Sequence, residues 1–168
     1  MRFFKTLLLF LFLIHHSCAQ VKDESFNIML NTLLSNSVEQ IDVEMLSKKI
    51  DQEDLIILDA REKIEFDVSH IEGAKHIGYD NFGKSALKDI DRDKELIVYC
   101  SVGYRSEKIG EKLEKLGFQN VKNLRGGIFE WKNKGFPVVN NQGDTTNKVH
   151  AFDKNWGIWL QNGEKVYE

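Results

Sequence analysis

Two short, unbroken apolar runs constrain the fold of this chain more than any other feature. Residues 55–58 (Leu-Ile-Ile-Leu) end at Asp59, and residues 96–99 (Leu-Ile-Val-Tyr) end at Cys100. Neither run alternates with polar residues, which is typical of strands buried on both faces of a parallel sheet covered by helices. The runs therefore predict an α/β fold in which Asp59 and Cys100 follow neighbouring strands.

The segments around these runs have helical periodicity. Apolar residues recur at helical spacing in residues 25–35, again after Asp42, which can cap a helix, and again between Arg105 and Gly117, a residue suited to end a helix. A short strand at 121–124 and an aromatic-bearing helix after Gly126-Gly127 are also predicted. Strands that alternate with helices indicate one α/β domain with a parallel sheet flanked by helices on both faces.

The first nineteen residues have the layout of a secretory signal peptide. Basic residues precede an apolar run at 7–14, and small residues lead to Ala19. This run is shorter than the roughly 20 residues of a membrane-spanning helix, which disfavours a permanent anchor. Cleavage after Ala19 predicts an exported, periplasmic or extracytoplasmic protein. The alternative is a lipoprotein anchored to the membrane through Cys18.

The remaining chain divides by composition. We expect a helical lead-in at 20–41, a main domain at 42–140, and at 141–168 a polar linker followed by an aromatic tail that docks on the domain, although this tail could also bind a partner. The 168 residues carry a formal net charge of -3, with basic and acidic residues interspersed. The sequence has no polybasic stripe, so binding to nucleic acid is not predicted. We therefore expect the function to depend on a localised site.

The loop after the second apolar run carries the candidate chemistry. If Cys18 is removed, Cys100 is the only cysteine, and its neighbours decide between a buried apolar residue and a nucleophile. Residues 100–106 join a strand to a helix, where inward-facing N–H groups and the helix N-terminus favour an anion. The same field favours a thiolate, so Cys100 is expected to be nucleophilic at neutral pH.

The other residues of this loop suit the same purpose. Gly103 can adopt the backbone angles that a ring of amides needs, and Arg105 offers a fork of donors for an oxyanion group of a substrate. Tyr104 is expected to form a wall of the pocket. Ser106 could donate a hydrogen bond to sulfur or cap the helix, and the sequence leaves both roles open.

The sequence Cys-Ser-Val-Gly-Tyr-Arg-Ser at 100–106 resembles the active-site loop of single-domain members of the rhodanese family, CxxGxRS. Three further segments resemble family motifs in the expected order. Residues 58–61 (Leu-Asp-Ala-Arg) resemble the D-x-R segment, and residues 69–74 resemble G-H-I-x-G-A with Ser69 in place of glycine. Residues 124–137 resemble the closing L-x-G-G-x-x-x-W and G-x-P pattern.

The resemblance implies a rhodanese-like fold and a ping-pong sulfurtransferase. Cys100 would alternate between thiolate and persulfide, moving sulfane sulfur from a small donor such as thiosulfate to cyanide or to a thiol, which could belong to a protein. Arg105 would bind the donor, and the amides of Ser101, Val102, Gly103, Tyr104 and Ser106 would stabilise the terminal sulfur. Asp59 and Arg61 would support the loop, and His70 is expected to be structural.

Two other functions remain open. A cysteine-based phosphatase or arsenate reductase also places a thiolate in a ring of amides, but typically with five residues between Cys and Arg, whereas four separate Cys100 from Arg105. A rhodanese-like binding module would need no nucleophile. No histidine has ligand spacing with a cysteine and no glycine fingerprint follows the first strand, so we expect neither a metal nor a cofactor.

Overall fold

The computed structural model describes residues 22–168, and the proposed signal peptide, with Cys18 and Ala19, lies outside the described residues. The chain separates into two compact units, Met1–Leu33 and Leu34–Glu168. Within the first unit, residues 22–33 form a helix, which agrees with the periodicity of residues 25–35. All elements named below belong to the second unit.

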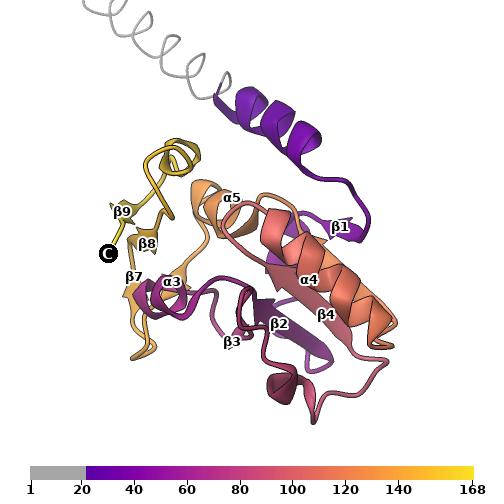
Figure 1. The fold of residues 1–168 in the computed structure, drawn as a ribbon. Helices are drawn as coiled ribbons and strands as arrows, with labels where there is room; N and C mark the ends of the chain where they lie inside the picture. The colour runs from indigo at the N-terminus through magenta and orange to yellow at the C-terminus, as the bar shows by residue number, and fades with distance from the viewer. Residues whose placement is uncertain (1–21) are drawn as a thin grey trace, which may run out of the picture. The chain divides into compact units, whose positions relative to one another are not determined.

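A five-stranded parallel sheet forms the centre of the second unit (Figure 1). β2 (Leu55–Asp59) and β4 (Glu95–Tyr99) are the two apolar runs, and they are adjacent, with Asp59 beside Tyr99. β5 (Asn120–Leu124) pairs with β4 on the other side. β1 (Glu39–Ile41) and β3 (Lys75–His76) are the edge strands, so the order is β1-β5-β4-β2-β3.

Helices cover both faces of this sheet, as predicted. They are α2 (Val43–Ser47), α3 (Lys63–Val68), α4 (Tyr104–Lys115) and α5 (Gly127–Asn133), with a 3-10 turn, η1, at Lys84–Leu87. On one face α4 packs on β4 and β5 (Figure 1), and Leu96 and Val98 share a buried cluster with Ile109 of α4. Ile97 and Tyr99 point to the opposite face and are also fully buried. The α/β prediction is therefore confirmed.

Two segments differ from the prediction in detail. β1 lies inside the segment 20–41 that was expected to be a helical lead-in, so this segment also supplies an edge strand. Three residues are too few to show a period, which explains why the sequence did not reveal this strand. α2 spans only Val43–Ser47, and the side chain of its N-cap residue Asp42, which was expected to cap the helix, makes no capping hydrogen bond.

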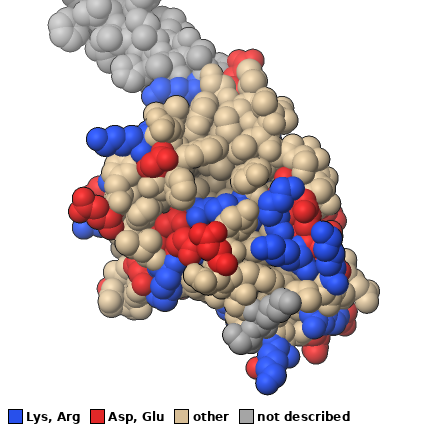
Figure 2. Space-filling view, in the orientation of Figure 1, with Lys and Arg blue, Asp and Glu red and all other residues tan. Residues whose placement is uncertain are grey.

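Charged side chains of both signs are interspersed on the surface. Figure 2 shows one face, where basic side chains gather over α4 next to acidic ones and neither sign covers the whole face. Within residues 22–168, none of the helices combines the length and the apolar character that crossing a membrane requires.

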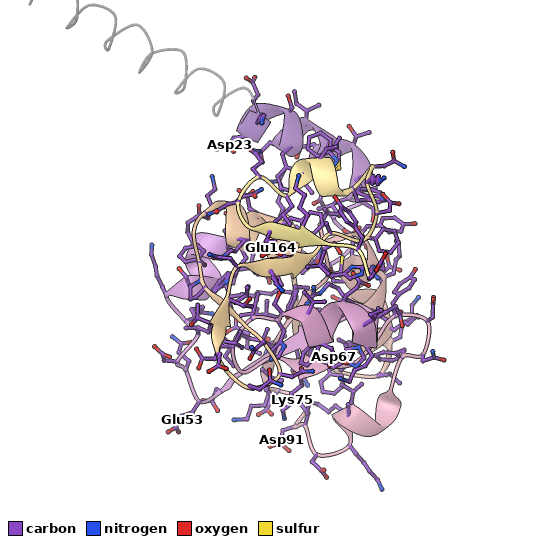
Figure 3. All side chains as sticks on the ribbon, turned by 90° about the vertical axis from the view of Figure 1, so that its left-hand side faces the viewer. Asp23, Glu53, Asp67, Lys75, Asp91 and Glu164 are labelled. Carbon is purple, nitrogen blue, oxygen red and sulfur yellow. The ribbon has the colours of Figure 1, made fainter. Side chains whose placement is uncertain are left out.

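Residues 138–166 form small sheets beside the main one. β6 (Val138–Val139) pairs antiparallel with β7 (Thr145–Thr146), and β8 (Lys148–His150) pairs parallel with β9 (Glu164–Val166), with a 3-10 turn, η2 (Gly157–Trp159), between β8 and β9. β8 packs against α3, and Figure 3 looks onto β8 and β9 with α3, marked by Asp67, below them.

The side chain of Asn133 ties this C-terminal segment to α5. Its Nδ2 donates to the carbonyl oxygen of Trp159 at 2.9 Å, and its Oδ1 accepts from the N–H of Gln161 at 2.7 Å. The segment that composition marked as a linker and aromatic tail thus belongs to the same compact unit as the sheet.

Candidate active site

The candidate site is built on the loop that joins β4 to α4. Cys100 follows the last residue of β4 at the carboxyl edge of the sheet, where open α/β folds bind ligands. Gly103 is the N-cap of α4 and has a φ of 112°, a left-handed angle that residues with side chains rarely adopt. The Gly103 N–H donates a hydrogen bond to Cys100 Sγ at 3.2 Å. Cys100 therefore lies at the N-terminus of α4, the end of the helix that carries a partial positive charge.

The N-terminus of α5 orients the peptide groups of this loop. The N–H of Ile128 donates to the carbonyl oxygen of Cys100 at 2.9 Å, and the N–H of Phe129 donates to that of Ser101 at 3.1 Å. A trans peptide points its N–H away from its C=O, so the N–H groups of Ser101 and Val102 point away from α5. The carbonyl groups of Cys100 and Ser101 thus face α5, and the N–H groups of Ser101 and Val102 face the opposite side. An anion-binding nest requires N–H groups that face one side in this way.

Gly127 permits this close approach of α5 to the loop. A Cβ at this position would lie 2.2 Å from the carbonyl oxygen of Cys100 and 2.7 Å from that of Ser101. The φ of Gly127 is also positive, at 55°. The sequence presents the glycine pair at 126–127 only as part of a family motif, and the structure shows that the second glycine is a steric requirement of the loop.

Arg105, in the first turn of α4, is held by the carboxylate of Glu65. Arg105 Nη1 donates to Glu65 Oε2 at 2.7 Å, and Nη2 donates to Glu65 Oε1 at 2.8 Å and to Ser101 Oγ at 3.0 Å. The Glu65 side chain is 2% exposed and the Arg105 side chain 14%. Sequence reasoning missed Glu65, for which the capping box of Glu62 and Glu65 at the start of α3 was the available signal.

The ion pair keeps both partners charged. Burial alone would lower the pKa of Arg105, but the hydrogen bonds and charge of Glu65 raise it above its ordinary value. Burial alone would raise the pKa of Glu65, but Arg105 and, more weakly, Arg61 hold it below its ordinary value of 4.5. The charge of Cys100 also contributes to the raised pKa of Arg105.

Ser106 fixes the turn at Gly103. Its Oγ donates to Asn123 Oδ1 of β5 at 2.6 Å and also lies 3.1 Å from the carbonyl oxygen of Gly103. Asn123 Nδ2 donates to the same carbonyl at 3.0 Å. The Ser106 hydroxyl therefore hydrogen-bonds the carbonyl oxygen of Gly103 and the side chain of Asn123, and not the sulfur of Cys100.

Asp59 and Arg61 form a fully buried ion pair next to the loop. Arg61 Nη2 donates to Asp59 Oδ2 at 2.6 Å and to the carbonyl oxygen of Ser69 at 2.7 Å. Ser69 is the C-cap of α3, so this pair holds the helix that carries Glu65. Asp59 also pairs in the sheet with Tyr99, the residue before Cys100, whose hydroxyl accepts the N–H of Ile71 at 3.1 Å. The two residues thus contact the end of α3 and lie beside the end of β4, and their support of the loop stays a prediction.

The backbone angles after α3 explain why Ser69 can replace the glycine of the family motif. Ser69 has a φ of -171°, extended backbone that any residue adopts, so the turn does not require glycine here. His70 exchanges backbone hydrogen bonds with Val139, its Nδ1 contacts the carbonyl oxygen of Phe66 at 3.1 Å, and its ring stacks on the Phe66 ring. These are structural contacts.

A pocket of about 230 Å³ opens above Cys100. Cys100 is only 1% exposed and lies at its base. The C-terminal segment contributes Phe152 and Trp156, and the Arg105 guanidinium lies 5.0 Å from the centre of the Phe152 ring. The full lining is Cys100, Ser101, Val102, Tyr104, Arg105, Phe152 and Trp156. The structure therefore places five of the predicted loop residues around one cavity, and it adds two aromatic residues that the sequence did not assign to the site.

The side chains of residues 22–168 include no group of three or more His, Cys, Asp or Glu arranged to hold a metal ion. The arrangement can instead hold a nucleophilic sulfur and stabilise negative charge on it with the Gly103 amide, the α4 N-terminus and the Arg105 guanidinium.

Comparisons with known proteins agree with this geometry. A tRNA uridine(34) hydroxylase of Photorhabdus laumondii is 30% identical over 128 residues, which are 70% of this chain and 34% of the relative, so the chain spans about a third of the length of the curated relatives it matches. A rhodanese-related protein of Thermoplasma volcanium is similar with a TM-score of 0.53 and 32% identity, covering 60% of this chain and 97% of that one.

A polysulfide-sulfur transferase homodimer of Wolinella succinogenes shares the fold, with a TM-score of 0.56 at 20% identity, covering 71% of this chain and 90% of that one. The model of the rhodanese-like domain matches residues 42–134, more than half of the chain and nearly the range in which the motifs were found. The chain therefore belongs to the rhodanese-like domain family.

Proposed function

We propose that this protein is a sulfurtransferase that carries sulfane sulfur as a persulfide on Cys100. The observation that carries the proposal is the position of Cys100 Sγ, which accepts the Gly103 N–H at 3.2 Å at the base of a pocket and at the N-terminus of α4. A thiolate placed in this way is a nucleophile, and an inert buried cysteine needs neither the glycine turn nor an arginine beside it.

The proposed reaction has two steps. The Cys100 thiolate attacks the outer sulfur of a donor such as thiosulfate, forming an S–S bond as sulfite leaves with the electron pair of the broken bond. A thiolate or cyanide then attacks the terminal sulfur of the persulfide, and Cys100 leaves as a thiolate. No electron acceptor and no cofactor are needed. The amides of Ser101, Val102 and Gly103 are proposed to stabilise the terminal sulfur.

The proposal is limited to sulfur chemistry. The relatives named tRNA uridine(34) hydroxylase are about three times as long as the part they share with this chain. The hydroxylase activity in their name is therefore not proposed for this protein. Export after cleavage near Ala19, or anchoring through a lipid on Cys18, remains a proposal that rests on the sequence of residues 1–19. The partners proposed are a small sulfur donor and a thiol acceptor, without nucleic acid.

The proposal is tested by mass spectrometry of the reduced protein after incubation with thiosulfate. We expect the mass of one added sulfur atom on Cys100, its removal by cyanide, and no gain in the Cys100→Ser variant. Because an activated thiolate is prone to over-oxidation, the protein has to be reduced first. If folded, reduced protein gains no sulfur from any sulfane donor, the sulfurtransferase proposal fails and the binding-module function replaces it.

A further inference from the structure

We propose that the physiological acceptor of this site is a thiol that carries an apolar, preferably aromatic, group, held between Tyr104 and the C-terminal residues Phe152 and Trp156. This inference deepens the proposed function and rests on it. It concerns the second step, in which a thiol removes the sulfur from Cys100.

The walls of the pocket are the first argument. Apart from Cys100, Ser101 and the ion-paired Arg105, the residues that line the pocket are Val102, Tyr104, Phe152 and Trp156. Tyr104 and Phe152 are 43% and 45% exposed, so two large side chains that line the same cavity leave apolar surface open to water. Apolar surface left open to water in a concave site indicates an apolar ligand.

The size of the pocket is the second argument. A cavity of about 150 Å³ binds benzene in other proteins. The pocket here has about 230 Å³, so it can hold one aromatic ring together with the thiol-bearing carbon. It is smaller than the roughly 300–1,000 Å³ typical of sites for drug-sized ligands, which favours a small thiol.

The charge balance of the site is the third argument. Among the described residues that line the pocket, Arg105 alone has a cationic side chain, and Glu65 binds it through both Nη atoms. Negative charge on Cys100, which lies at the base of the pocket, also raises the pKa of Arg105, so the guanidinium interacts with the sulfur as well as with Glu65. The outer part of the pocket therefore presents aromatic faces and no unpaired cation to an acceptor, which disfavours small hydrophilic anions compared with an uncharged organic group.

The aromatic wall is built by a segment that the family match does not include. The family model ends at residue 134, whereas Phe152 and Trp156 follow β8. Phe152 has a φ of 64°, which is uncommon for a residue with a large side chain and costs conformational energy. Its N–H donates to His150 Nδ1 at 3.2 Å, and its ring lies over Arg105. The segment thus accepts strain where it brings an aromatic ring over the pocket.

The chemistry of the step balances without another reactant. The thiolate of the acceptor attacks the terminal sulfur of the Cys100 persulfide, and a new S–S bond forms as the bond to Cys100 Sγ breaks. The electron pair of that bond stays on Sγ as a thiolate, and the acceptor leaves as an organic persulfide. The pocket contributes by holding the organic group so that its thiolate is aimed at the terminal sulfur.

The test compares two uncharged thiols on protein already loaded with sulfur. The loaded protein is separated from thiosulfate and mixed with benzyl mercaptan or with 2-mercaptoethanol, and loss of the sulfur mass is followed over time. Each rate is divided by the rate at which the same thiol removes sulfur from a small persulfide in solution. We expect a ratio of about ten in favour of benzyl mercaptan, the factor that burying roughly half an aromatic ring provides.

Variants connect the preference to the aromatic wall. Phe152→Ala and Trp156→Ala should each lower the ratio about threefold, and the double variant should bring it near one. Met45→Ala, on α2 and 48% exposed, is the matched control for removing an exposed apolar side chain and should keep the ratio. A ratio near one in the unchanged protein, or a ratio that both wall variants preserve, overturns the proposal.

A second measurement separates this proposal from the proposed function. The unloaded protein is alkylated with N-phenylmaleimide or N-ethylmaleimide, and the rates are normalised to those of a free thiol. A preference for the phenyl reagent that disappears in the double variant supports the aromatic pocket even if sulfur loading fails, in which case only the sulfurtransferase function is lost. Sulfur loading without either preference refutes the acceptor proposal and leaves the function intact.

Discussion

Replacing Glu65 by Gln removes one negative charge from the ion pair that holds Arg105, with almost no change in shape. The carboxylate now accepts from both Nη atoms of Arg105, at 2.7 and 2.8 Å. An amide offers only one oxygen, and its NH₂ group would face the guanidinium as a second donor. Arg105 would then keep a largely buried charge without its partner.

The expected cost follows from the burial of the pair. Breaking a buried ion pair by removing one partner costs about 3–5 kcal/mol. The Arg105 side chain is 14% exposed and can turn part of its charge towards water, so we expect the lower end, about 3 kcal/mol. For a domain of this size this corresponds to a fall in Tm of roughly 6–12 °C.

Urea unfolding of both proteins at neutral pH measures this difference, with an unchanged m-value showing that the folded and unfolded states remain comparable. Glu72→Gln, at an exposed position, is the matched control and should change stability by less than about 0.5 kcal/mol. A loss below about 1 kcal/mol in Glu65→Gln would refute the structural role of the ion pair.

The pH dependence gives an independent check. Because the folded-state pKa of Glu65 lies below its ordinary value of 4.5, its contribution to stability is present above that value and is lost as pH falls through the folded-state pKa. The difference between the unchanged protein and Glu65→Gln should therefore be full at pH 7 and shrink below about pH 4.5. A difference that stays constant down to the acid transition contradicts the assignment.

Two further variants test the backbone and the buried pair below the loop. Gly127→Ala should lower sulfur transfer about 100-fold, because a Cβ 2.2 Å from the carbonyl oxygen of Cys100 has to displace the loop. Gly73→Ala is the control for backbone strain alone, because Gly73 has a φ of 76° and open space around the Cβ position. Equal losses of activity in the two variants would refute the steric reason. Asp59→Asn should lower the free energy of unfolding by about 3–5 kcal/mol, or Tm by roughly 6–20 °C, because Arg61 keeps a fully buried charge. Asp67→Asn breaks the exposed pair with Lys63 and should lower the free energy of unfolding by less than about 1 kcal/mol. Equal Tm values for the two variants in thermal unfolding would contradict this explanation.

The sequence was sufficient for the centre of the fold because its central strands are apolar on both faces. β2 and β4 coincide with the two runs, and β5 and α4 follow where periodicity and Gly117 indicate. β1 and β3 were not predicted because strands of three and two residues show no period. Strands of this length pair only because longer neighbours already form the sheet.

The site was predictable where its chemistry is local in sequence. Residues 100–106 are consecutive, so the order of a strand end, a glycine turn and a helix start is enough to place Cys100 and Gly103 together. Phe152 and Trp156 reach the same cavity from a segment more than forty residues later. Nothing in their local spacing points at Cys100, because their position depends on how β8 packs against α3.

Arg105 lines the same pocket as Cys100, but the sequence did not reveal its ion-pair partner Glu65. The motif indicates a guanidinium beside the nucleophile, and from that alone an anionic donor is the natural ligand. Glu65 changes the electrostatics of this position, because it shares the positive charge before any substrate arrives. Under the proposed function, the guanidinium would act on the persulfide sulfur and the aromatic residues would contact the organic part of the acceptor. The proposed selectivity of this pocket therefore depends on a carboxylate in α3 and on two aromatic residues after β8, none of which belongs to the loop that carries Cys100.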